Sequence, residues 1–275
     1  MTDEGGIKVF PWLLRVANLF AARSLHYVVV GGWLIHFLKK HPFIGACLKK
    51  FTGIYVETIV MKHAREELGF ENIILMPNFK PLTPVAPEQL TEQNQAPFRF
   101  CTFSRVMKEK GIDDAVDAVR AVNARFGKSM CTLDIFGQID PGQVEWFENL
   151  QKTFPTEIRY CGVINYEQSV EVLKDYFALL FPTEFFTEGV PGTIIDAYAA
   201  GVPVVAAKWE SFADVIDDGV TGIGYPFGKQ ACLKEVIATI VNHPEIANGM
   251  KANCLQKADR YLLDNVIDIL FSRLS

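Results

Sequence analysis

The sequence predicts an α/β protein with two Rossmann-like parallel sheets, the first of them only partial. Strand-like apolar runs alternate with helical segments from about His26 to the end of the chain, a pattern typical of parallel α/β sheets. A proline-rich segment, residues 77–97, divides the chain into two unequal parts. The larger part contains six strand-like runs, which are enough for a complete doubly wound domain.

The first part, residues 1–80, is predicted to be a partial domain. It opens with an amphipathic helix whose apolar face consists of Phe10, Leu13, Leu14, Ala17 and Phe20. Three strands are predicted after it, separated by helical segments: His26–Val30, Gly53–Glu57 and Asn72–Leu75. Three strands are too few for a full doubly wound sheet.

Residues 81–96 are predicted to be a linker, because this stretch is rich in proline and has no apolar periodicity. Residues 97–255 are predicted to form the second Rossmann-like domain, and residues 256–275 a helical tail. The six strands of the second domain are expected at Phe98–Phe103, Met130–Phe136, Glu157–Cys161, Tyr176–Phe181, Val202–Ala206 and Gly222–Tyr225.

The composition indicates a folded protein, since 49% of the 275 residues are apolar and 21% are charged. The net charge of −5 is unevenly distributed. Residues 1–80 carry 10 Lys and Arg against 6 Asp and Glu, a net of +4, which leaves residues 81–275 with a net of −9. An acidic larger domain argues against a nucleic-acid partner. The basic first part is suited to peripheral contact with an anionic membrane surface or with a lipid-linked acceptor.

The sequence shows no sign of export or of a membrane span. Asp3 and Glu4 stand where a signal peptide needs positive charge, and Ser24–Leu38 is too short an uncharged stretch to cross a bilayer. The six cysteines and five histidines show no metal-binding spacing. A reduced, cytoplasmic location is therefore the simpler interpretation.

The most informative segment is TEFFTEGVPGTIIDAYAAGVPVVA, residues 183–206, between two predicted buried strands. A helix is predicted from about Pro191 to Ala200, because proline is tolerated in a first helical turn and Gly201 ends the pattern. The free amides of Gly192 and Thr193, together with the helix dipole, favour an anion such as a phosphate.

Two acids, Glu188 and Asp196, flank this helix start eight residues apart. Carboxylates only accept hydrogen bonds, which suits the hydroxyl groups of a sugar or a ribose. Taken alone, two such acids are ordinarily a helix cap and a solvated charge. The whole segment, however, resembles the acid-x7-acid signature of retaining glycosyltransferases with the GT-B fold, family 4, especially the bacterial members that build capsular and surface polysaccharides. The resemblance implies that Glu188 holds the transferred sugar and that Asp196, a shorter version of the usual Glu, holds the ribose.

A second cluster, FSRVMKEKG in residues 103–111, follows the first strand of the second domain, at the edge where open α/β sheets bind ligands. Arg105 and Lys110 are suited to grip phosphate oxygens. The alternative is a solvated basic loop, but basic residues at a helix start oppose the dipole unless an anion is present. The same spacing in family 4 enzymes implies that this pair binds the donor diphosphate.

The resemblance implies further contacts with the nucleotide sugar, partly through main-chain groups at strand ends and partly through the loop before the helix. Simple turns explain the glycine after the second strand equally well. The implied residues are Gly137, Val163, Ile164, Glu184, Gly189, Val190, Pro191, Gly192 and Thr193.

The same resemblance extends to domain organisation. In that family MPN at residues 76–78 closes the N-terminal domain and YVVVGGWL at residues 27–34 falls in its second half. The chain is therefore expected to lack the earlier strands of that domain and part of the acceptor site. The chain end is expected to pack back on the first domain. No metal and no cofactor are expected, because GT-B enzymes generally bind no metal and the sequence has no DxD-like motif.

The implied function is transfer of a sugar, with retention, from a UDP- or GDP-sugar to a glycan or lipid-linked acceptor. It would take place in the cytoplasm or at the inner face of the membrane. Two alternatives stay open: a truncated, non-catalytic nucleotide-sugar-binding module, and a nucleotide-sugar epimerase on the same fold.

Overall fold

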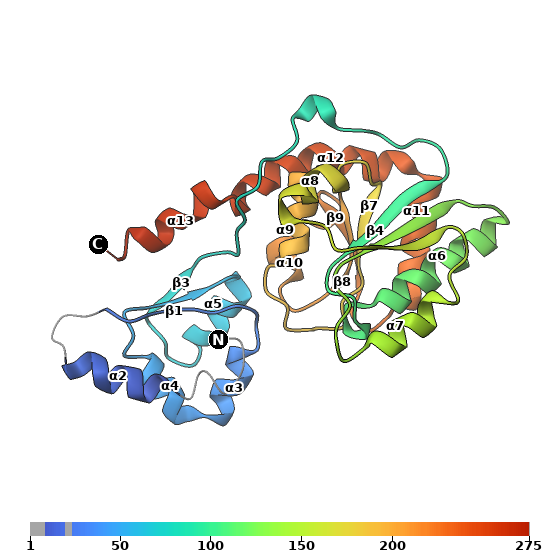
Figure 1. Cartoon of the computed structure of the whole chain (residues 1–275). Coiled ribbons are helices and arrows are strands. Elements are labelled where there is room, and N and C mark those ends of the chain that lie inside the picture. Colours follow the sequence, from blue (N-terminus) through green and yellow to red (C-terminus); the bar gives the residue numbers. More distant parts are fainter. Residues whose placement is uncertain (1–8, 20–23, 275) are drawn as a thin grey trace.

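The structure is a computed structural model that describes residues 9–19 and 24–274. Two parallel sheets lie side by side and are joined by a long connection (Figure 1). The predicted α/β class is confirmed. Helix α2 (Phe10–Leu19) corresponds to most of the predicted amphipathic helix, whereas Phe20 lies outside the described residues.

The N-terminal sheet has the strand order β1–β2–β3. Its central strand, β2, is buried along its whole length. Apolar side chains of the sheet and of the surrounding helices pack together in a small core. Thr58 caps the helix that follows β2 by accepting a hydrogen bond from Met61 N at 3.2 Å. The elements are β1 (His26–Val28), α3 (Leu34–Lys40), α4 (Pro42–Leu48), β2 (Gly53–Val56), α5 (Ile59–Glu66) and β3 (Ile73–Leu75).

The C-terminal sheet has the order β6–β5–β4–β7–β8–β9, with every neighbouring pair parallel. The direction of strand succession reverses between β4 and β7, and open α/β sheets bind ligands at such a switch point. The strands are β4 (Phe98–Phe103), β5 (Cys131–Phe136), β6 (Ile158–Gly162), β7 (Ala178–Phe181), β8 (Val204–Lys208) and β9 (Gly222–Pro226).

Four of these strands begin later than predicted, β5 and β6 by one residue and β7 and β8 by two. β7 starts at Ala178 because Tyr176 still belongs to a turn, in which its amide donates to Leu173 O at 2.9 Å. β8 starts at Val204 because Pro203 has no amide hydrogen to give to a sheet.

Helices cover both faces of the C-terminal sheet. Apolar side chains on one face pack against α6 (Ile112–Phe126), α7 (Val144–Gln151) and α11 (Ala231–Asn242). Those on the other face pack against α8 (Ser169–Leu173), α9 (Gly192–Ala199), α10 (Phe212–Val215) and α12 (Pro244–Ala258). Short 3-10 turns complete the chain: η1 (Pro87–Gln89), η2 (Lys108–Lys110), η3 (Tyr166–Gln168) and η4 (Asp259–Tyr261).

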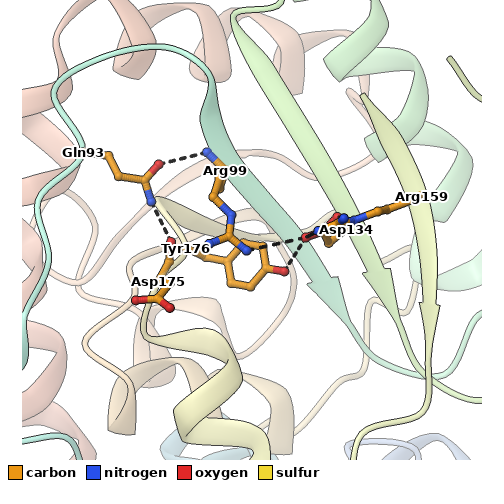
Figure 2. Close-up of polar contacts among 6 residues, drawn as sticks. All are labelled: Gln93, Arg99, Asp134, Arg159, Asp175 and Tyr176. Carbon is orange, nitrogen blue, oxygen red and sulfur yellow. Dashed lines mark hydrogen bonds and ion pairs between the residues drawn. The ribbon is translucent and has the colours of Figure 1, made fainter. Parts of the chain in front are cut away.

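A charged side chain, Asp134, lies within the C-terminal sheet and is only 3% exposed (Figure 2). Its carboxylate accepts hydrogen bonds from Arg159 Nε and from Tyr176 Oη, each at 2.5 Å, and Arg99 Nη2 lies 3.8 Å away. Burial alone would raise the pKa of Asp134, but these hydrogen bonds and the two positive charges outweigh it, so that the pKa lies below its ordinary value. Arg159 and Arg99 come from the strands on either side of β5, and Tyr176 comes from the turn before β7, so the cluster ties these parts of the sheet together.

The connection between the sheets runs beside the end of the chain. Lys80 N donates to Tyr261 O at 3.0 Å, and Leu263 N donates to Lys80 O at 3.1 Å. Helix α13 (Leu263–Phe271) then reaches back toward the N-terminal sheet, where Val266 packs in a small cluster with Tyr55 and Met76 (Figure 1). Across the described residues, no helix combines the length and apolar character needed to cross a membrane.

Candidate active site

A cavity of about 360 Å³ lies between the two halves of the molecule, where β4 and β7 end and face the end of β2. This is the point at which the strand order of the C-terminal sheet reverses. The N-terminal half contributes Glu57, Asn78 and Lys80 to its wall. The structure brings most of the predicted site residues to the same cavity: Arg105, Lys110, Glu188, Gly189, Val190, Pro191, Gly192, Thr193 and Asp196.

Lys110 owes its position to the glycine that follows it. Gly111 has a left-handed backbone with φ +68°, and a Cβ there would lie 2.1 Å from Pro182 O, so the turn from η2 into α6 requires glycine. The Lys110 ammonium lies 5.0 Å from the centre of the Phe185 ring and forms an ion pair with Glu188. Thr183 Oγ1 donates a second hydrogen bond to the same carboxylate at 3.2 Å.

Arg105 lies on the rim of this cavity. Its side chain is 63% exposed, and Nη1 lies 3.6 Å from Asp140 Oδ2. An exposed pair of this kind is worth little to stability, so the guanidinium is free to turn toward an anion.

The start of helix α9 forms another part of the wall. Pro191 is the N-cap, and the first amide to donate within the helix is that of Ile194, to Pro191 O at 3.0 Å. The amides of Gly192 and Thr193 precede it at the positive end of the helix dipole. Thr193 Oγ1 is buried and has no hydrogen-bond partner among the described residues.

The loop before α9 is held from the N-terminal half of the molecule, chiefly by Glu57 and Asn78, which were not among the predicted site residues. Glu57 Oε2 accepts a hydrogen bond from Val190 N at 2.9 Å, and Asn78 Nδ2 donates to Val190 O at 3.0 Å. Gly32 N donates to Thr187 O at 2.7 Å. Glu57 follows β2, and Asn78, the last residue of the MPN segment, closely follows β3.

Glu57 is a buried carboxyl group, 7% exposed. Its pKa is raised to about 7, mainly by burial; hydrogen bonds from the main chain of Val190 and Gly31 oppose the rise, and the nearby charge of Glu188 adds to it. A Cβ on Gly189 would lie 1.6 Å from Glu57 Oε2, so a larger residue there would displace the Glu57 carboxyl group.

Asp196 is 1% exposed, and its two carboxylate oxygens are both engaged. Lys80 Nζ lies 2.5 Å from Oδ2, and Ser169 Oγ donates to Oδ1 at 2.8 Å. Burial raises the pKa of Asp196 against the opposing charge and hydrogen bond of Lys80. Lys80, too, was missed from the sequence, because it lies 116 residues from its partner.

The remaining predicted residues do not line this cavity. Gly137, Val163 and Ile164 line an adjoining, mostly apolar slot of about 160 Å³, together with Phe103 and Phe136. Glu184 is exposed and lies outside both, and its amide donates to Glu109 O at 2.9 Å.

Together these features suit a nucleotide sugar. Cations and helix-end amides bind phosphate, and carboxylates accept hydrogen bonds from hydroxyl groups. A slot with an aromatic and aliphatic lining accommodates a flat base.

Comparison with known proteins points the same way. Residues 97–259, most of the C-terminal half, match the protein family described as Glycosyl transferases group 1. The chain belongs to this family. No curated protein matches the chain significantly.

The fold is also that of solved GT-B glycosyltransferases. Staphylococcus aureus TarM, solved with UDP, is 16% identical with a TM-score of 0.76 over 98% of this chain. Anabaena HepE with UDP is 18% identical with a TM-score of 0.79 over 97% of the chain. Sucrose-phosphate synthase from Thermosynechococcus elongatus is 16% identical with a TM-score of 0.76 over 96% of the chain. The chain spans 54% of TarM, 75% of HepE and 71% of the synthase.

Proposed function

We propose that the protein is a retaining glycosyltransferase of the family 4 type that uses a nucleoside-diphosphate sugar as donor. The observation that carries the proposal is the composition of one cavity. Arg105 and Lys110 lie there with the N-terminus of α9, and Glu188 and Asp196 lie in the same wall. Cationic and anionic groups of this kind are needed together to hold a diphosphate between two hydroxyl-rich sugars.

The proposed reaction breaks the bond between the anomeric carbon of the sugar and the diphosphate. A bond forms between that carbon and a hydroxyl oxygen of the acceptor on the same face, which retains the configuration. The hydroxyl proton passes to the departing phosphate oxygen. Arg105, Lys110 and the amides of Gly192 and Thr193 stabilise the negative charge that develops there, and each such contact contributes about 10²–10³ in rate.

For the acceptor we propose a glycan or a lipid-linked glycan, in cell-surface polysaccharide synthesis at the inner face of the cytoplasmic membrane. The N-terminal half supports peripheral contact with an anionic membrane. Trp12 of α2 and Phe43 of α4 are 67% and 68% exposed. Exposed lysines end the neighbouring helix α3, at Lys39 and Lys40, and directly follow α4, at Lys49 and Lys50.

Calorimetric titration with UDP, GDP and ADP tests the donor site. We expect one of them to bind saturably, and Arg105→Ala to weaken that binding about 10- to 100-fold, because a charged hydrogen bond contributes about 1.5–3 kcal/mol. Arg125→Ala is the matched control, since Arg125 is an exposed arginine paired with Glu235, away from the cavity. If Arg105→Ala leaves the nucleotide affinity unchanged, the donor binds elsewhere. If the wild-type chain binds none of the three nucleotides, the proposal is contradicted.

The products separate this function from its alternatives. Sugar transfer to an added acceptor identifies a transferase, and isomerisation of the donor without an acceptor identifies an epimerase. Nucleotide binding with neither product leaves a non-catalytic nucleotide-sugar-binding module.

A further inference from the structure

Glu188 and Asp196 each form an ion pair with a lysine. Glu188 is paired with Lys110, which comes from the same half of the molecule. Asp196 is paired with Lys80, which comes from the connection that leaves the N-terminal sheet. The resemblance to family 4 accounts for Lys110 alone, so the second lysine needs an explanation of its own.

The main chain of Lys80 is fixed, and its side chain reaches the start of α9. The Lys80 amide and carbonyl groups are hydrogen-bonded to Tyr261 and Leu263. A Cβ on Gly192 would lie 3.0 Å from Lys80 Cε and 3.4 Å from Nζ, so the ammonium lies beside the first turn of the helix. The Lys80 side chain is 29% exposed and lines the cavity, whereas that of Asp196 is 1% exposed.

An ammonium group at the N-terminus of a helix opposes the helix dipole. Asp196 offsets this repulsion with a single negative charge. A diphosphate at the same place offers more negative charge and oxygen acceptors for both lysines and for the helix amides. The location of Lys80 is therefore better explained by an anionic ligand than by Asp196 alone.

On the basis of the donor-binding function proposed above, we propose that Lys80 is a donor-binding residue whose ammonium contacts the diphosphate of the nucleotide sugar from the N-terminal half of the cavity. The diphosphate draws Lys80 and Lys110 away from their carboxylates. Asp196 and Glu188 are then free to accept hydrogen bonds from the ribose and from the transferred sugar. Donor binding in this way also joins the two halves of the molecule.

Titration of the full chain with UDP and with uridine tests this proposal, because only UDP has a diphosphate. We expect Lys80→Met to weaken UDP binding at least tenfold and to leave uridine binding within about twofold. Lys80→Arg keeps a cation and is expected to retain most of the UDP affinity. Lys62→Met is the matched control, since Lys62 is paired with Glu66 on α5 outside the cavity, and it should change neither affinity.

The double variant Lys80→Met/Asp196→Asn distinguishes phosphate contact from charge neutralisation. If Lys80 only neutralises Asp196, the double variant regains the preference for UDP over uridine, and the proposal is overturned. If Lys80 contacts the diphosphate, that preference stays low. Because the double variant has no unpaired buried charge, it also serves if Lys80→Met does not fold.

Other outcomes are equally decisive. An equal loss of UDP and uridine binding in Lys80→Met would mean that Lys80 acts through Asp196 and the ribose, and unchanged UDP binding would mean that it has no part in the site. If UDP binding depends on Arg105 but not on Lys80, only the role of Lys80 is rejected. If the wild-type chain binds neither UDP, GDP nor ADP, the donor-binding function itself fails.

Discussion

At the scale of single residues, Glu57 lines the cavity and also forms a hydrogen bond between the two halves of the molecule. It comes from the end of β2, yet its carboxyl group holds the amide of Val190 in the loop that carries Glu188. Asn78 holds the carbonyl group of the same residue. The loop that we propose to bind the donor sugar is thus shaped by side chains from the other half of the molecule.

We predict that Glu57 makes stability depend on pH. Its pKa rises from 4.5 to about 7 in the folded protein, so the folded state holds a proton that the unfolded chain has released. The contribution is complete below about pH 4.5 and is lost as the pH rises through about 7. A pKa rise of this size changes the contribution of Glu57 to the free energy of unfolding by on the order of 3 kcal/mol.

Glu57→Gln should remove this dependence, because the neutral amide can still accept the hydrogen bond from Val190. Urea unfolding of both proteins between pH 5 and pH 8 measures it. We expect the variant to be the more stable protein above pH 7 and the difference to shrink toward pH 5. Parallel curves for the two proteins would show that Glu57 does not titrate in this range.

At the scale of elements, β5 shows how a strand carries a charge inside a sheet. The run Cys131–Phe136 is apolar except for Thr132 and Asp134, and it forms the expected strand. Three side chains from outside the strand satisfy the Asp134 carboxylate: Arg159 of β6, Arg99 of β4 and Tyr176 before β7 (Figure 2). Gln93 extends the cluster by accepting a hydrogen bond from Arg99 N at 3.0 Å.

We predict that Asp134→Asn lowers the free energy of unfolding by about 2 kcal/mol at pH 7, because it weakens the charge-assisted hydrogen bonds that Arg159 and Tyr176 donate to this buried carboxylate. Since the folded pKa of Asp134 is below the ordinary value of 3.8, its contribution is present above that value and is lost as the pH falls through the folded pKa. The gap between wild type and variant should therefore narrow in strong acid.

Urea denaturation of both proteins at several pH values measures this gap. Glu235→Gln is the control, because it breaks the exposed Arg125–Glu235 pair, which we expect to cost less than about 1 kcal/mol. If the two substitutions lower the free energy of unfolding equally, the buried cluster contributes no more to stability than the exposed pair.

At the scale of the whole molecule, contacts between the halves set the shape of the cavity. Thr58 Oγ1 and Ser211 Oγ are 3.0 Å apart, and Val60 N donates to Asp214 Oδ2 at 2.9 Å. Helix α13 adds an apolar contact, since Val266 is 1% exposed and packs with Tyr55 and Met76. Helix α13 thus stabilises the N-terminal sheet.

We predict that Val266→Ala destabilises the N-terminal half by about 2 kcal/mol, because it removes buried methyl groups and leaves a small cavity. Limited proteolysis should show faster cleavage within residues 24–76. Phe271→Ala is the control on the same helix, since Phe271 is 59% exposed, and it should change the cleavage rate little. Unchanged cleavage in Val266→Ala would mean that α13 is not needed to hold this half.

The sequence by itself determined the α/β class, the strands within about two residues of their final bounds, the helix that begins near Pro191, and the two motifs that hold Arg105, Lys110, Glu188 and Asp196. The class and the elements follow from local periodicity and turn residues, which neighbouring residues along the chain establish together, whereas the two motifs stand out through their resemblance to family 4 glycosyltransferases. Only the tertiary structure decided that Glu57, Asn78 and Lys80 complete the cavity and that Glu184 lies outside it. Their partners lie 112 to 133 residues away in the chain, and such contacts depend on how the two sheets pack rather than on any local pattern.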